Sequence, residues 1–211
     1  MKTLVCALVT TAGLTLGSAA DAATFRFDTD PFAGVDVSDP ARQIIGGEEF
    51  IDFDIAHDVF KLESTVFGLN GTDVLFANAL AGNLPTGNVN VVVLQSFDND
   101  NDPLTPFGAG SAANLIADQI TTPGPGFFIY FNSGLDLPRL VFSTDLSDST
   151  ADLKILFRLT NTDLRGQSGR DAIPSFTADN FEITAVPEPA TLALIAFGLA
   201  AGIGRARRRR T

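Results

Sequence analysis

The chain has 211 residues, and its 25 acidic residues against 14 lysines and arginines give it a formal net charge of −11. This excess of negative charge argues against nucleic acid and anionic lipid as partners, because nothing offsets the repulsion from phosphate groups. The single cysteine, Cys6, lies near the N-terminus, so the rest of the chain can form no disulfide, thiol nucleophile or Cys-ligated zinc site.

The first residues have the order of charges and apolar residues found in a secretory signal peptide. Lys2 precedes an apolar stretch over residues 3–17, and small residues follow that end in Ala20-Asp21-Ala22. This pattern predicts a signal peptide over residues 1–22, with export by the Sec machinery and cleavage after Ala22. An uncleaved N-terminal anchor is the alternative.

Residues 23–185 form the predicted body, which shows the alternation and the turn signals of a β protein. In residues 49–55, for example, isoleucine and phenylalanine alternate with aspartate, as in a half-buried strand. The apolar runs at 91–94 and 127–131 predict central strands covered on both faces. This many short strands predict one mainly β domain, a two-sheet β-sandwich with one or two short helices. The expected strands span residues 24–28, 49–55, 58–67, 73–77, 88–97, 126–132, 139–143 and 175–184.

Two segments depart from this strand pattern. Residues 112–120 have apolar side chains at helical spacing, and Ser111 is placed to cap that helix. In residues 149–159 the alternation of a strand competes with a capping-box pattern formed by Ser149 and Asp152, and we favour a helix.

Glycines in three places are interpreted as turns. Asn70-Gly71 is a typical hairpin turn, and it lies between two expected strands. The glycine-rich segments at 108–110 and 166–169 lack the context of a phosphate-binding loop, so both are interpreted as turns.

The densest group of oxygen ligands is Asp98-Asn99-Asp100-Asn101-Asp102, which has a carboxylate at every second position. Calcium binds six to eight oxygens, so Asp98, Asp100 and Asp102 are candidate calcium ligands. The EF-hand pattern fails after them, because Pro103 replaces the turn glycine and Ala109 replaces the bidentate glutamate. A solvated acidic turn is therefore the favoured interpretation.

No catalytic constellation stands out in the body. His57, the only histidine, lies beside Asp54 and Asp58, and such a pair can act in acid–base catalysis. There is no G-x-S-x-G nucleophile motif, and one histidine cannot make a histidine-rich metal site, so we interpret His57 as a surface turn residue. We expect a protein that is not an enzyme and needs no cofactor. The alternative is a secreted carboxylate-based hydrolase or a calcium-assisted glycan-binding module, although the chain has no tryptophan and only one tyrosine for stacking on sugars.

The C-terminal segment, residues 186–211, combines three signals. Val186-Pro187-Glu188-Pro189 should be extended, because proline disfavours helix in the residue before it. The uncharged residues 190–204 predict a helix roughly 22 Å long. This segment is shorter than the roughly 20 residues that usually span a bilayer. The basic end is predicted to stay on the cytoplasmic side of the membrane, so the body faces the other side. It consists of Arg205, Arg207, Arg208, Arg209 and Arg210.

A signal peptide together with Val-Pro-Glu-Pro, a short apolar segment and an arginine cluster resembles the PEP-CTERM class of exported bacterial proteins. The C-terminal segment of that class is also labelled the C-terminal domain of ice-binding proteins. The resemblance implies a Gram-negative bacterium that makes exopolysaccharide, and a membrane protease of the exosortase type that recognises the Pro-Glu-Pro motif.

These signals predict the route of the protein. We expect it to be exported, to be held briefly in the inner membrane by its C-terminal transmembrane helix, and to be cut near Pro187 to Pro189. The body then lies at the cell surface or in the extracellular matrix as a secreted protein, with exopolysaccharide as a candidate partner. The sequence indicates no ligand for the body.

Overall fold

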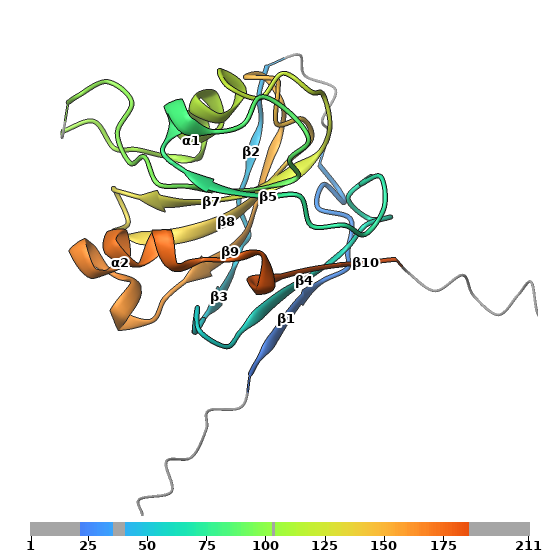
Figure 1. The fold of residues 1–211 in the computed structure, drawn as a ribbon, viewed down its shortest axis with the longest axis horizontal. Helices are drawn as coiled ribbons and strands as arrows, with labels where there is room; N and C mark the ends of the chain where they lie inside the picture. Colours follow the sequence, from blue (N-terminus) through green and yellow to red (C-terminus); the bar gives the residue numbers. More distant parts are fainter. Residues whose placement is uncertain (1–21, 36–40, 103, 186–211) are drawn as a thin grey trace, which may run out of the picture.

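Two β-sheets and two short α-helices make up the body, which confirms the mainly β fold predicted from the sequence (Figure 1). The computed structural model describes residues 22–35, 41–102 and 104–185. The predicted signal peptide as far as residue 21 and the predicted sorting segment 186–211 lie outside these described residues.

The smaller sheet has three parallel strands. β4 (Val59–Glu63) is its central strand, with β1 (Thr24–Phe27) on one side and β10 (Phe181–Thr184) on the other. Thr24 pairs with Val59 at the start of β4, and Thr184 pairs with Glu63 at its end. The chain therefore enters this sheet at one end and leaves it at the other.

The larger sheet has an antiparallel centre. β7 (Gly126–Asn132) pairs with β8 (Leu137–Ser143), and β8 pairs with β9 (Leu153–Leu159). β7 is buried along its whole length, as predicted from its run of aromatic and β-branched residues.

Parallel strands extend the larger sheet on both sides. β6 (Val91–Leu94) pairs with β7, and β5 (Phe76–Ala79) pairs with β6. On the other side, β2 (Ile44–Ile45) and β3 (Glu49–Ile51) both pair with β9. Every residue of β6 is buried, which confirms the second predicted central strand.

Phenylalanines fill the space between the two sheets. Side chains alternate along a strand, so Phe127, Ile129 and Phe131 of β7 all face this core. Phe60 of β4 stacks on Phe157 of β9 with 5.6 Å between ring centroids, which joins the smaller sheet directly to the larger one. Phe53 stacks on Phe60 at 4.1 Å, and neither ring is exposed to solvent.

A second core lies on the opposite face of the larger sheet. Phe128 and Tyr130 of β7 point to this face, where they belong to the same buried cluster as Ala112 and Ile116 of helix α1 (Ala109–Ala117). α1 lies in the crossover between the parallel strands β6 and β7, a connection that must be long enough to return the chain to the same end of the sheet.

Short helical segments connect β9 to β10. They begin directly after β9 and bring the chain from the larger sheet back to the smaller one. A further 3₁₀ turn, η1 (Ala81–Asn83), lies between β5 and β6. The segments after β9 are η2 (Thr162–Leu164), α2 (Gly166–Ala172), η3 (Ile173–Ser175) and η4 (Ala178–Asn180).

The helix favoured over residues 149–159 is wrong, because this segment contains strand β9. Leu153, Ile155 and Phe157 alternate with the less buried Lys154 and Arg158, and the strand is hydrogen-bonded on both sides. The capping-box pattern is satisfied differently, since Asp152 accepts a hydrogen bond from the backbone N–H of Gln43 at 2.8 Å.

Four local predictions about caps and turns are also wrong. Helix α1 has Gly108 as its N-cap, without a side-chain cap, and Ser111 lies inside the helix. The segments at 108–110 and 166–169 begin α1 and α2 instead of forming turns. Asn70-Gly71 closes no hairpin, because β4 and β5 on either side of it belong to different sheets.

The predicted strand positions are confirmed with changed ends. Strands β3, β4, β6 and β10 are shorter than predicted, and β8 begins two residues earlier than predicted. β5 begins three residues later than the predicted strand at 73–77.

Candidate functional site

An open cleft of about 800 Å³ lies where the loop after β3 meets the segment after β9. The first loop contributes Asp52 and Asp54 to its lining, and the second contributes Asn161 and Asp163. All three carboxylates are on exposed residues, so the cleft presents negative charge to solvent. The other lining residues are Phe53, Ile55, Ala56, Thr162, Leu164, Ala172 and Ser175.

Asn161 and Phe53 fix the two sides of this cleft to each other. The Asn161 side chain accepts a hydrogen bond from the backbone N–H of Phe53 and donates one to its carbonyl oxygen. The Phe53 ring is buried in the core between the sheets, where it stacks on Phe60. Hydrogen bonds and the packing of Phe53 therefore hold the cleft together, although its two sides come from distant parts of the sequence.

His57 and Asp54 form an exposed pair beside the cleft. Nδ1 of His57 lies 2.7 Å from Oδ2 of Asp54, and about half of each side chain is exposed. The hydrogen bond from His57, together with one from the backbone N–H of Ala56, lowers the pKa of Asp54. Asp54 thus stays ionised, whereas a carboxyl that acts as a general acid needs a raised pKa. His57 lies in a surface turn, as predicted.

Asp58 does not join His57, although the two are adjacent in the sequence. Its side chain turns inward and only 5% of the residue is exposed. Oδ1 accepts a hydrogen bond from the backbone N–H of Ala23, and Oδ2 accepts one from that of Asp54. No sequence pattern predicts this inward carboxylate, because its partners are backbone groups.

The candidate calcium ligands lie in an exposed loop after β6. Oδ1 of Asp98 accepts hydrogen bonds from the backbone N–H groups of Asp100 and Asn101, and Asp100 and Asp102 each accept one from a backbone N–H two residues on. The bonds from Asp100 and Asn101 lower the pKa of Asp98.

These bonds are those of an acidic turn. Over the described residues, no three acidic or histidine side chains are arranged to hold a metal ion. Arg170 lines the same small cleft as Asp98 and Asp102, and its positive charge opposes that of a bound cation. The calcium site stays a prediction.

A buried ionic cluster on the larger sheet was not predicted. Glu48 accepts hydrogen bonds from Arg139 of β8 and Arg158 of β9, which are partners in the strand register. Only 8% of the Glu48 side chain is exposed. Burial alone raises the pKa of Glu48, but hydrogen bonds from its own backbone N–H and from the two arginines outweigh this and lower the pKa from 4.5 to about 2.

The predicted sorting segment begins where the fold ends. β10 ends at Thr184, and the described chain ends one residue later, at Ala185. Val186, Pro187, Glu188, Pro189 and the arginines from Arg205 to Arg210 all lie outside the described residues, and so does the predicted transmembrane helix. Within the part of the chain that the structure describes, no helix has the length and apolar character needed to cross a membrane.

Comparison with known proteins gives a match on this segment. The family model of the PEP-CTERM protein-sorting motif matches residues 185–210, which confirms the resemblance seen in the sequence. No curated protein and no solved structure matches the chain. The chain therefore carries a PEP-CTERM protein-sorting motif, which marks it as an exported protein sorted by an exosortase.

Proposed function

We propose that the chain is delivered by its C-terminal segment to the cell surface or the exopolysaccharide matrix, where its body acts without catalysis. The C-terminal helix holds the exported chain briefly in the inner membrane, and an exosortase cuts it near Pro187 to Pro189. The match to the sorting motif at residues 185–210 is the observation that carries this proposal.

The position of the motif supports cleavage of a folded protein. β10 is an edge strand of the smaller sheet, and the match begins one residue after its end. A cut at Pro187 to Pro189 therefore removes no described strand and none of the buried core residues. The body released by the cut keeps both of its cores.

Cell fractionation tests this route. In cells that contain an exosortase, we expect the wild-type protein at the surface or in the matrix, and the variant Pro187→Ala/Pro189→Ala in the membrane fraction. Pro123→Ala, an exposed proline in a loop of the body, is the matched control and should distribute like the wild type. If the double variant also leaves the membrane normally, the motif does not direct sorting.

The acidic cleft favours a second candidate function, which is binding of a neutral or cationic glycan by the body. The cleft is open to solvent, and the carboxylates of Asp52, Asp54 and Asp163 are suitable hydrogen-bond acceptors for sugar hydroxyls. The hydrolase alternative needs a carboxyl that donates a proton, and the lowered pKa of Asp54 speaks only against Asp54 in that role.

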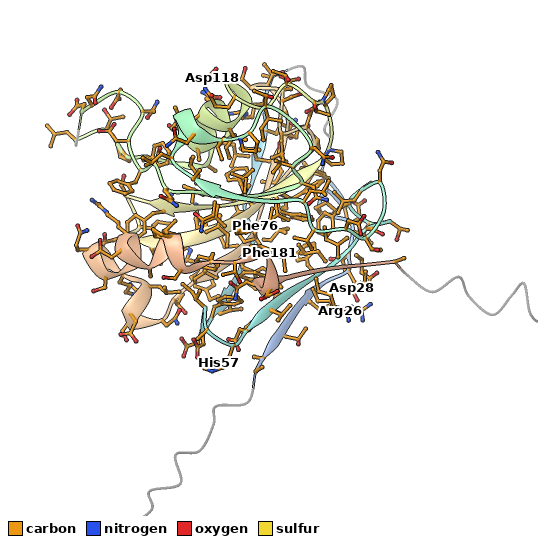
Figure 2. All side chains as sticks on the ribbon, viewed as in Figure 1. Arg26, Asp28, His57, Phe76, Asp118 and Phe181 are labelled. Atoms are coloured by element: carbon orange, nitrogen blue, oxygen red, sulfur yellow. The ribbon has the colours of Figure 1, made fainter. Side chains whose placement is uncertain are left out.

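A glycan array, with and without calcium, separates binding from the non-catalytic structural role. A bound glycan should be lost in Asp52→Asn/Asp163→Asn and kept in Asp118→Asn. Asp118 is an exposed aspartate at the end of α1, far from His57, which lies beside the cleft (Figure 2). Cleavage of a defined glycan would instead establish the hydrolase. No binding under either condition would remove this second candidate.

A further inference from the structure

Asp58 is a buried carboxylate without a positively charged partner. Both of its oxygens accept hydrogen bonds from neutral backbone groups, Ala23 N–H at 2.7 Å and Asp54 N–H at 2.8 Å. In the described residues, no lysine, arginine or histidine side chain forms an ion pair with it. Burial of a lone charge is costly, so the environment of Asp58 favours a cation at the position of its nearest donor.

That donor, Ala23, is the first residue after the predicted signal cleavage site. Hydrolysis of the Ala22–Ala23 peptide bond adds water across it, which leaves a carboxylate on Ala22 and an amine on Ala23. The amine takes up a proton at neutral pH and becomes an ammonium with three N–H donors. We infer that this ammonium is the counter-charge of Asp58, so that removal of the signal peptide completes the fold of the smaller sheet. The inference rests on export as proposed above.

The geometry fits cleavage at this bond and no other. Ala22 is exposed, and the carbonyl oxygen of Ala23 accepts a hydrogen bond from Val59 N–H at 3.0 Å. A cut one residue later would remove both the donor to Asp58 and the acceptor from Val59. A cut one residue earlier would leave a neutral amide at Ala23 and place the charge one residue further from Asp58.

Asp58 is also the point where the starts of all three strands of the smaller sheet meet. Ala23 leads into β1, and Asp58 itself leads into β4. Its backbone carbonyl accepts a hydrogen bond of 3.0 Å from the side chain of Asn180, the last residue before β10. A stronger bond at Asp58 therefore stabilises the whole sheet.

The other charged groups near Asp58 have partners of their own. His57, which Figure 2 shows at the end of the molecule where β1 begins, pairs with Asp54. On β4, Lys61 pairs with Glu182 of β10 at 2.8 Å. On β1, Arg26 pairs with Asp28 and Glu63. The ammonium of Ala23 is thus the group placed to neutralise Asp58.

Thermal unfolding of two chains tests the inference. One begins with Ala23 as its free N-terminus and runs to Thr211, and the other keeps Ala22 in front of it. At pH 7 the chain that begins at Ala23 should have a Tm higher by roughly 3–8 °C, as expected for one partly buried charged hydrogen bond in a domain of this size. Asp58→Asn should abolish the difference. If Asp58→Asn does not fold, acetylation of the Ala23 amine makes the same comparison, because it removes the charge and keeps one N–H.

The pH dependence has a definite sign. An ammonium that gains a carboxylate partner has a higher pKa in the folded state than in the unfolded state, where an α-amino group has a pKa of about 8. Its contribution to the stability of the fold is therefore not reduced until the pH rises above about 8, and it disappears as the pH rises through the folded pKa. The two chains should therefore converge in alkaline solution. The His57–Asp54 pair is present in both chains, so its contribution to stability cancels from the difference.

Equal Tm values of the two chains at pH 7 would overturn the inference, whatever happens during sorting. The intact mass of the exported protein gives an independent check, since it should show Ala23 as the first residue. A different first residue would also overturn the inference. A chain that is not sorted but keeps the Tm difference would contradict only the proposed function.

Discussion

Replacement of Glu48 by glutamine removes the charge that joins Arg139 and Arg158 and keeps the shape of the side chain. The pKa of Glu48 falls from 4.5 to about 2, and at about 1.4 kcal/mol for each pH unit this corresponds to about 3 kcal/mol. Solvent reaches Arg158, whose side chain is 22% exposed, and screening reduces the effect to about 2 kcal/mol. For a domain of this size we expect Glu48→Gln to lower the Tm at pH 7 by roughly 4–8 °C.

The pH dependence follows from the direction of the shift. The folded pKa lies below the unfolded one, so Glu48 stabilises the fold fully above about pH 4.5 and loses this contribution as the pH falls toward 2. The stability difference between wild type and Glu48→Gln should therefore shrink over the same range. Urea unfolding followed by circular dichroism from pH 7 to pH 2 measures it.

Glu49→Gln provides the matched control, because Glu49 is the next residue and is exposed. It makes the same change in charge and should leave the Tm within about 1 °C. If the free energies of unfolding of wild type and Glu48→Gln differ by the same amount from pH 5 to pH 2, the buried cluster does not stabilise the fold through the charge of Glu48. The same conclusion holds if Glu48→Gln and Glu49→Gln lower the Tm equally.

Three further predictions concern the core, the cleft and the acidic loop. Phe60→Ala should lower the Tm by roughly 6–20 °C, since truncation of a buried phenylalanine costs about 3–5 kcal/mol. Phe50 is 64% exposed, so Phe50→Ala should lower the Tm far less, and equal effects in thermal unfolding would contradict the described core. His57→Ala should raise the pKa of Asp54 toward its usual range in an NMR titration, and an unchanged pKa would show that the pair does not form in solution. Millimolar calcium should leave the Tm unchanged if Asp98, Asp100 and Asp102 form an acidic turn, whereas a rise that Asp98→Ala/Asp100→Ala abolishes would establish the calcium site.

Local patterns in the sequence predicted the strands whose burial is uniform. β7 was predicted with both of its ends, because a run of five aromatic and β-branched residues fits a strand covered on both faces. β9 was missed because its burial is not uniform. Lys154 and Arg158 are four residues apart and suggest a helical face, but Lys154 donates to the carbonyl of Gly46 and Arg158 binds Glu48, and neither partner is visible in the local sequence.

The pairing of the strands could not be predicted, because it depends on contacts between distant residues. β4 pairs in parallel with β1 and with β10, which lies more than 100 residues later in the chain. The hairpin signal at Asn70-Gly71 is strictly local, and it gave the wrong partner for β4. The cleft has the same origin, since Asp52 and Asp163 line it together because β3 pairs with β9 and Asn161 bonds to Phe53. The sorting motif, in contrast, is contiguous and could be identified from the sequence alone.

The intact mass of the protein purified from two strains, one with an exosortase and one without, tests whether an exosortase cuts the chain at its sorting motif. We expect the chain from the exosortase-containing strain to end near Pro187 to Pro189, at the start of the matched motif, and the chain from the other strain to keep Thr211. Identical C-termini in the two strains would contradict this expectation.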